Sequence, residues 1–261
     1  MNTALQKEKA LLKQLASYPA LGIAYSGGVD STYLAACAHE ALDDRALLMV
    51  GDFPAFPRWE LEEAVQMAND RGWNLQIIST PKSHHAAYSK NDPQRCYHCK
   101  NELFKHLKSL HPNLPLAHGA IEDDRGEHRP GARAAEEQQI LAPLQDVGLF
   151  KKEIRILSER RGLPSAQKAP FACLATRFPT GTSFTSKQLA QIEQAEEVLR
   201  QLGFKQYRIR HHGETCRIEI LPEAFDHLVE NRTKILKAIH PLGFRFVSLD
   251  LDGYRTGSSD Y

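Results

Sequence analysis

A short glycine-rich stretch carries the clearest chemical signal in this sequence. LGIAY at residues 21–25 predicts a buried strand, and SGGVDS leads from it into a helical pattern that runs to about Leu42. A strand, a glycine turn and a helix N-terminus place backbone N–H groups and the positive end of a helix dipole around one point. This suits a phosphate or pyrophosphate, although a plain tight turn capped by Asp30 or Ser31 is the alternative. The candidate contacts are Ser26, Gly27, Gly28, Asp30 and Ser31.

Two lysines later in the chain fit the same chemistry. Lys151 and Lys152 stand at the start of the helical pattern KKEIRILSER. The helix dipole disfavours cations at this end, so lysines here indicate a nearby anion. The alternative is a solvated basic face on which Lys151 and Arg155 point to water.

The spacing of three cysteines is a third feature. RCYHCK contains Cys96 and Cys99, and Cys173 follows much later in PFACLATRFP. Such cysteines suit a metal or an iron–sulfur cluster, a redox pair, or half of a zinc site completed by His98 or another histidine. A 4Fe-4S cluster held by only three cysteines would leave one iron open for an exogenous sulfur.

Paired arginines predict an anion site toward the C-terminus. Arg208 and Arg210 lie two positions apart in an alternating strand pattern, so they share one face. Two adjacent guanidinium groups repel unless an anion lies between them, and a substrate phosphate or carboxylate meets that need. A charged strand edge that opposes aggregation is the alternative. Arg177, four residues after Cys173, is a further candidate for an anion contact.

Alternating strand and helix patterns must position these groups. Apolar runs at 21–25, 45–50, 74–79 and 114–119 predict strands, and the helical patterns between them predict βαβ units on a parallel sheet. This pattern breaks near residues 162–164.

A different order of elements follows the break. A helical pattern at 186–202 precedes two alternating strands at 206–212 and 216–222, which favours antiparallel pairing. We therefore predict an α/β fold, with a parallel sheet flanked by helices over residues 1–168 and a smaller α+β domain over residues 169–261.

Composition bounds the class of protein. The chain has 261 residues and a formal net charge of +1, which gives no global attraction to nucleic acid or to an anionic membrane. No apolar run approaches the length of a bilayer span, and the charged start lacks a signal-peptide pattern. We expect a cytoplasmic protein, with neither membrane nor nucleic acid as partner. Five cysteines, an odd number, argue against a disulfide framework; Cys37 and Cys216 follow patterns typical of buried apolar residues.

The order of the motifs resembles a known family. The glycine-rich stretch resembles the PP-loop of the N-type ATP pyrophosphatases. RCYHCK, HRPGAR, FKKEIR, ACLATRFPTGT, YRIR and RFVSLDLDGYRTGS then follow at roughly the intervals of the LarE family, over residues 21–257. LarE proteins are ATP-dependent sulfur transferases that build the nickel-pincer cofactor of lactate racemase.

The resemblance implies a fold and a reaction. The first domain would have an adenine nucleotide alpha hydrolase-like fold that binds ATP and Mg²⁺. The substrate would be a pyridinium mononucleotide whose carboxylates are adenylated and receive sulfur from a sulfide donor, with release of AMP and pyrophosphate. The family's assembly implies a homo-oligomer, a hexamer.

The resemblance also implies roles for individual residues. One branch of the family sacrifices a cysteine, and another holds a 4Fe-4S cluster with three; this chain looks like the second, with Cys96, Cys99 and Cys173 as ligands. Lys151 would contact ATP, and Arg208 and Arg210 the substrate phosphate. Glu196 and Glu219 match acidic positions near the sulfur-transfer site. Cys173, Glu196 and Arg177 are the predicted catalytic group.

Several departures and alternatives stay open. HGAIEDD stands where the family commonly reads D-G-T-N before an acidic pair, so His118 and Ile121 alter the nucleotide pocket, and His98 stands where tyrosine is frequent. A 4Fe-4S-dependent tRNA thiolation enzyme is one rival function. A non-catalytic adenine-nucleotide sensor with a structural zinc is another. Cys173 as the consumed sulfur source is a further alternative.

Overall fold

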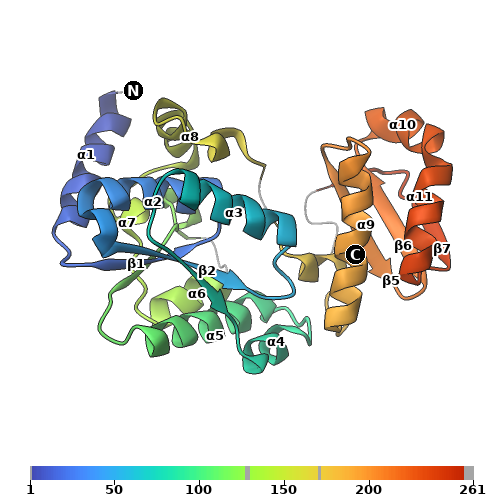
Figure 1. Ribbon diagram of the computed structural model, residues 1–261, viewed down its shortest axis with the longest axis horizontal. Coiled ribbons are helices and arrows are strands. Elements are labelled where there is room, and N and C mark those ends of the chain that lie inside the picture. The colour runs from blue at the N-terminus through green and yellow to red at the C-terminus, as the bar shows by residue number, and fades with distance from the viewer. Residues whose placement is uncertain (1, 127–129, 170–171, 256–261) are drawn as a thin grey trace. The chain divides into compact units, whose positions relative to one another are not determined.

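The computed structural model describes residues 2–126, 130–169 and 172–255 (Figure 1). The chain forms two compact units. The first comprises Met1–Ala87 and Gln94–Phe171, and the second comprises Tyr88–Pro93 and Ala172–Tyr261. The predicted boundary at residues 168/169 lies close to the division at Phe171/Ala172, and the short segment Tyr88–Pro93 is an addition that the sequence prediction did not contain.

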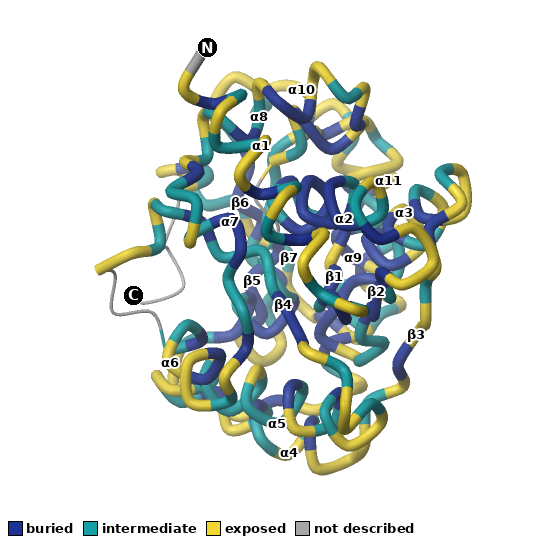
Figure 2. Tube along the Cα trace, turned by 90° about the vertical axis from the view of Figure 1, so that its left-hand side faces the viewer, coloured by how far each residue is buried: buried dark blue, intermediate teal, exposed yellow. Residues whose placement is uncertain are grey.

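The first unit is built on a four-stranded sheet in the order β3-β2-β1-β4. All neighbouring strands are parallel, which confirms the predicted sheet. Because helices cover both faces of such a sheet, its inner strands are apolar along most of their length, and β1 and β2 are largely buried (Figure 2). The strands are β1 (Leu21–Tyr25), β2 (Ala46–Asp52), β3 (Leu75–Ser79) and β4 (Leu116–His118).

Helices form the outer layers of the first unit. One core cluster joins α1, α2, α3 and α8 to the sheet, through residues such as Leu15, Leu34, Ala64 and Ile154. A second cluster, which includes Met49 and Phe104, joins α5 and α6. The helices are α1 (Asn2–Ala16), α2 (Val29–Leu42), α3 (Arg58–Asp70), α4 (Lys82–Tyr88), α5 (Arg95–Leu110), α6 (Pro130–Glu137), α7 (Pro143–Asp146) and α8 (Lys151–Arg160).

The second unit is a small α+β structure, as predicted. Its sheet has the order β5-β6-β7, in which β5 and β6 are antiparallel and β7 is parallel to β6. Thr185 and Gln188 form a capping box at the start of the long helix α9. The main elements are η4 (Leu174–Arg177), α9 (Ser186–Gln201), β5 (Tyr207–His212), β6 (Thr215–Ile220), α10 (Phe225–Glu230), α11 (Arg232–Ile239) and β7 (Phe246–Leu249).

Some features of the sequence lie outside the described residues. These include His128 and Arg129 of HRPGAR, and the end of the last motif from Thr256 onward. Throughout the described ranges, no helix has both the length and the apolar character that a membrane span requires.

Candidate active site

The glycine-rich loop joins β1 to α2 and leaves the start of that helix open. Gly28 is the N-cap residue, and no side chain among the described residues caps the helix. Ser31 instead closes the loop, since its Oγ accepts a hydrogen bond from Ser26 N at 3.2 Å and donates to Gly28 O at 3.2 Å. The capping alternative for Asp30 and Ser31 is therefore wrong. The first N–H groups of α2 can therefore donate to a bound anion.

The two loop glycines have different physical reasons to be glycine. Gly27 has a φ of +69°, and a Cβ there would lie 2.7 Å from the Cβ of Ala64. The protein itself requires glycine at this position. Gly28 has a φ of −75°, and a Cβ there would meet only Ser26 Oγ, at an ordinary 3.5 Å. The fold therefore does not require glycine at position 28, and a side chain there would instead enter the space in front of the loop.

Asp30 and Lys151 form an ion pair across the first unit. Lys151 Nζ donates to Asp30 Oδ2 at 2.6 Å, while Asp30 Oδ1 is buried with no hydrogen-bond partner in the described structure. Burial raises the pKa of Asp30, and the hydrogen bond from Lys151 opposes that rise. The Asp30 carboxylate is therefore one of the anions that the position of Lys151 led us to expect.

The helix face behind Lys151 is not solvated. Arg155 donates to Ala166 O at 2.6 Å and to Lys168 O at 3.0 Å. The alternative in which Lys151 and Arg155 both point to water is therefore wrong, because each side chain has partners within the unit.

A cavity of about 650 Å³ opens in front of the glycine-rich loop. This volume is typical of small-molecule sites. One part of its wall is aromatic, where Phe53 and Phe56 stack with ring centroids 5.8 Å apart. Another part is polar and includes Ser26, Asp30 and Ser31. An apolar wall suits a planar base, whereas open N–H groups suit phosphates.

The C-x-x-C motif lies at this cavity. Both cysteines belong to the first turns of α5. Cys96 is exposed and lines the cavity. Cys99 is half-buried, with its Sγ 3.3 Å from Nε2 of the fully buried His84. Among the residues that the structure describes, no three His, Cys, Asp or Glu side chains form a group able to hold a metal ion.

Sequence reasoning missed several residues of the cavity wall. Lys100 follows Cys96 by one helical turn, a spacing that brings it to the same face of α5. Asp124 lies on the wall beyond β4, and its Oδ2 accepts a hydrogen bond from Ile121 N at 3.0 Å. The rule that ligands bind at the carboxyl ends of parallel strands was the signal that could have found Phe53, after β2, and Asp124.

His118 lies at the end of β4 and lines the same cavity. Burial, with the nearby charge of Lys100, lowers the pKa of His118 to about 4. Its imidazole is therefore neutral at pH 7 and packs edge-on against Phe104, with centroids 6.0 Å apart. Of the two residues predicted to alter the nucleotide pocket, His118 lines this cavity and Ile121 is buried.

The second unit contains Cys173, Arg177 and Glu196. Cys173 is half-buried and directly precedes the turn η4, which ends at Arg177. The Arg177 guanidinium forms two hydrogen bonds to the Glu196 carboxylate, at 2.7 and 3.0 Å, and both side chains are buried. Glu196 is thus not a surface carboxylate. Cys37 and Cys216 are buried as expected, and burial raises the pKa of each thiol to about 12.

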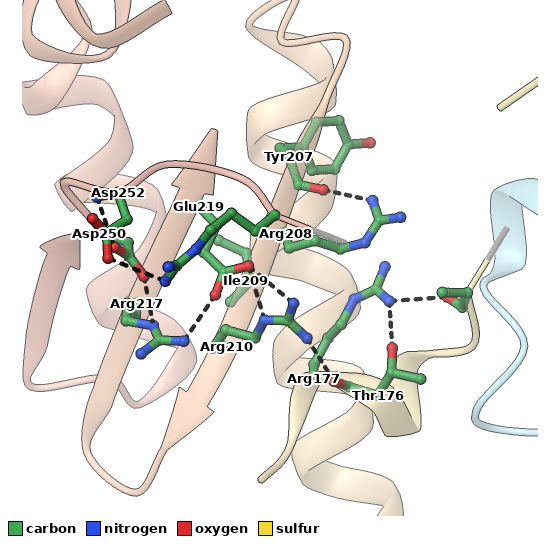
Figure 3. A network of polar contacts seen from close by, with 12 residues as sticks. Thr176, Arg177, Tyr207, Arg208, Ile209, Arg210, Arg217, Glu219, Asp250 and Asp252 are labelled. Atoms are coloured by element: carbon green, nitrogen blue, oxygen red, sulfur yellow. Dashed lines mark hydrogen bonds and ion pairs between the residues drawn. The ribbon is translucent and has the colours of Figure 1, made fainter. Parts of the chain in front are cut away.

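The two arginines of β5 differ in their partners (Figure 3). Arg210 pairs with the fully buried Glu219 at 2.9 Å. Arg208 donates to Tyr207 O at 2.7 Å and lies over the Tyr254 ring at 5.1 Å. No carboxylate of the described chain is within ion-pair distance of Arg208, and burial, followed by the charge of Arg177, lowers its pKa. Arg208 is therefore the member of the pair whose charge an added anion would best neutralise.

A parallel sheet with a glycine-rich loop and an open helix N-terminus at its carboxyl edge is typical of nucleotide-binding α/β proteins. The loop sequence SGGVDS fits the PP-loop class among them. Comparison with known proteins agrees with this class. GMP synthase of Brucella ovis is 27% identical over 74% of this chain and 41% of its own length. No family model matches the chain.

Two further relatives cover almost the whole chain. An uncharacterized protein of Synechocystis is 35% identical, over 90% of this chain and 90% of its own length. The pyridinium-3,5-bisthiocarboxylic acid mononucleotide synthase of Lactiplantibacillus plantarum is 33% identical, over 98% of this chain and 95% of its own. The chain belongs to the LarE family. This kinship supports an ATP-utilizing enzyme.

Proposed function

We propose that this protein is an ATP-dependent sulfur transferase that acts on a pyridinium mononucleotide. The observation that carries the proposal is the Asp30–Lys151 pair beside the open N-terminus of α2, with Asp30 on the wall of a cavity whose other wall is aromatic. The relative named as pyridinium-3,5-bisthiocarboxylic acid mononucleotide synthase supplies the substrate class.

The first step is adenylation of a substrate carboxylate. A carboxylate oxygen attacks the α-phosphorus of ATP, the bond from that phosphorus to the β-phosphate bridge breaks, and pyrophosphate leaves. The N–H groups of the loop and the Lys151 ammonium stabilise the negative charge that develops on the phosphates. Phe53 and Phe56 provide an apolar wall for the adenine.

Asp30 fits a role as ligand of the magnesium that accompanies ATP. Its buried Oδ1 has no hydrogen-bond partner in the described chain, and carboxylate oxygens are preferred by this cation. The bound cation would supply positive charge to the phosphates. Lys151 holds the other oxygen and so fixes the orientation of the carboxylate.

The second step replaces oxygen by sulfur. A sulfide attacks the acyl carbon of the adenylate, the bond from carbon to the AMP oxygen breaks, and a thiocarboxylate forms. We assign this chemistry to the region of Cys173, with Arg208 as the contact for the substrate phosphate. Arg210 was predicted for the same phosphate, but its pairing with Glu219 makes Arg208 the better anchor.

The cysteines provide donors for a 4Fe-4S cluster. Cys96 and Cys99 lie one helical turn apart on α5, a spacing that lets two thiolates bind the same cluster. Cys173 belongs to the second unit and is proposed as the third ligand. Such a cluster, when bound, would supply an iron able to carry sulfide.

The test combines metal analysis with product analysis. Protein purified without oxygen is assayed for iron, acid-labile sulfide and visible absorbance, beside the Cys96→Ala variant. The proposal expects iron and sulfide in equal amounts, with a broad absorbance that the variant loses. The same protein, given ATP, Mg²⁺, sulfide and the pyridinium dicarboxylate mononucleotide, is expected to form AMP and a product in which sulfur replaces oxygen.

Several outcomes would contradict the proposal. Zinc in place of iron, together with ATP binding but no AMP, would favour the nucleotide sensor. Thiolated tRNA in place of thiolated mononucleotide would favour the tRNA enzyme. A mass loss at Cys173 that matches conversion to dehydroalanine would make Cys173 the consumed sulfur source.

A further inference from the structure

Two buried arginines meet at the short turn that follows Cys173. The turn η4 runs from Leu174 to Arg177 in the second unit. Arg177 is the last residue of this turn, and Arg210 reaches the turn from β5 (Figure 3). Both side chains are almost completely buried. Buried guanidinium groups are costly unless they are paired, so these contacts are built into the fold.

The first arginine holds the start of the turn. Arg177 Nη1 lies 3.0 Å from Ala172 O and 2.8 Å from Thr176 Oγ1. Thr176 in turn donates to Cys173 O from its hydroxyl at 2.8 Å and from its backbone N–H at 3.0 Å. The backbone carbonyl of Cys173 therefore accepts from Thr176 twice and, at 3.4 Å, from Arg177 Nη1, which also donates to the Thr176 hydroxyl.

The second arginine holds the end of the turn. Arg210 Nη1 donates to Thr176 O at 2.7 Å, and its Nε donates to Glu219 Oε2 at 3.0 Å. Thr176 thus contacts Arg177 through its hydroxyl and Arg210 through its carbonyl. The backbone around Cys173 is held from two sides.

A buried glutamate orients each arginine. Glu196 accepts two hydrogen bonds from Arg177, and its Oε1 also accepts one from Ile209 N at 3.1 Å. Glu219 accepts from Arg210 through one oxygen and from Arg217 Nη2 at 2.8 Å through the other. The oxygens of both carboxylates accept hydrogen bonds from arginines, and Glu196 accepts one from the backbone as well. Carboxylates bonded in this way typically orient the groups around them.

We infer that Arg177–Glu196 and Arg210–Glu219 form a clamp that fixes the backbone of Cys173. In this clamp Glu196, Arg210 and Glu219 are positioning residues, and they act on the thiol through Thr176 and Arg177. The importance of the clamp for sulfur transfer rests on the proposed function. The effect of the clamp on the Cys173 thiol does not rest on the proposed function, and it can be measured without an activity assay.

The first test uses a matched pair of substitutions at Thr176. Thr176→Val removes the hydroxyl that accepts from Arg177 and donates to Cys173 O, whereas Thr176→Ser keeps it. In full-length protein treated with chelator and reductant, Thr176→Val should speed deuterium exchange in the peptide that covers 173–178 about fivefold, since one hydrogen bond is lost. Iodoacetamide should alkylate Cys173 faster by a similar factor. Thr176→Ser should match the parent protein in both measurements.

The second test compares two arginines that share one partner. Arg210→Lys retains a charge for Glu219 but cannot also reach Thr176 O in the same geometry. Arg217→Lys also changes a partner of Glu219, but Arg217 pairs in addition with Asp250, at 3.6 Å, and both residues lie on the side of Arg210 away from Thr176 (Figure 3). Arg210→Lys should speed Cys173 alkylation while Arg217→Lys leaves it unchanged, at equal melting temperature.

The results that would overturn the clamp are distinct from those that would overturn the function. Equal alkylation rates in Thr176→Val and Thr176→Ser, or equal effects of the two arginine variants, would show that the turn is not held in this way. If the clamp is supported while no thiolated product forms, only the proposed function fails.

Discussion

Lys151 Nζ lies 2.6 Å from Asp30 Oδ2, so an ion pair joins the start of α8 to the first turn of α2 across 121 positions of sequence. The dipole of α8 disfavours a lysine at its N-terminus, but Lys151 is stabilised there because it neutralises Asp30 at the N-terminus of α2. Lys152 follows it directly but is exposed. The two lysines therefore provide a matched test of the pair.

Lys151→Met should slow AMP formation about 100-fold, because a cation that stabilises the phosphates is removed and Asp30 keeps an uncompensated charge. Lys152→Met should retain the parent rate. Chromatographic measurement of AMP with saturating ATP and acceptor distinguishes the two. Asp30→Asn should abolish AMP formation, and an undiminished rate in it or in Lys151→Met would remove the pair from the mechanism.

The two loop glycines should separate stability from binding. Gly27→Ala should lower the free energy of unfolding by at least about 1 kcal/mol, because it forces a positive φ on alanine and drives a Cβ against Ala64. Gly28→Ala should leave the melting temperature unchanged, yet weaken binding of an ATP analogue at least about tenfold as its Cβ enters the ligand space. Calorimetric titration and thermal melting measure these effects. Unchanged nucleotide affinity in Gly28→Ala would place the phosphates elsewhere.

His118 should make the first unit sensitive to acid. Its folded pKa of about 4 lies below the ordinary value of 6.5, so between these pH values the unfolded chain binds more protons. The contribution of His118 to the free energy of unfolding is complete above pH 6.5 and is lost progressively as the pH falls from 6.5 to about 4. Going from pH 7 to pH 5 should cost about 2 kcal/mol in unfolding free energy.

The matched variant is His118→Gln, which is uncharged at both pH values. Urea unfolding at pH 7 and pH 5 should show a smaller acid loss in His118→Gln than in the parent, by about 2 kcal/mol. His84, whose pKa burial also lowers, contributes to both proteins and cancels in the difference. Equal losses in the two proteins would mean that His118 is not kept neutral by its surroundings.

Nucleotide should protect Cys96 from alkylation. Cys96 lines the cavity and is exposed, so a bound ATP analogue with Mg²⁺ would cover it. Mass spectrometry of chelator-treated protein should show at least about fivefold slower modification of Cys96 at a saturating analogue concentration. Cys37 and Cys216 are buried and should stay unmodified with or without nucleotide. No protection of Cys96 would argue that the ligand lies away from α5.

Local sequence patterns were enough to predict the chemistry of the glycine-rich loop and the order of the elements. Strand 21–25, the glycine-rich turn and the helix to Leu42 were predictable, because hydrophobic periodicity and glycine act within a few residues. The parallel sheet followed from alternation, and the antiparallel pairing of β5 with β6 followed from two adjacent alternating segments. Both predictions are confirmed.

Which of these residues contact one another depends on how the chain folds in three dimensions. Spacing alone could not join Lys151 to Asp30, or distinguish Arg208 from Arg210, because both outcomes depend on strand order and register. In β5 and β6 the register sets Arg208 opposite Glu219 and Arg210 opposite Arg217, yet the long side chain of Arg210 reaches diagonally to Glu219. Burial then makes that pairing obligatory, since a guanidinium group removed from water requires an acceptor.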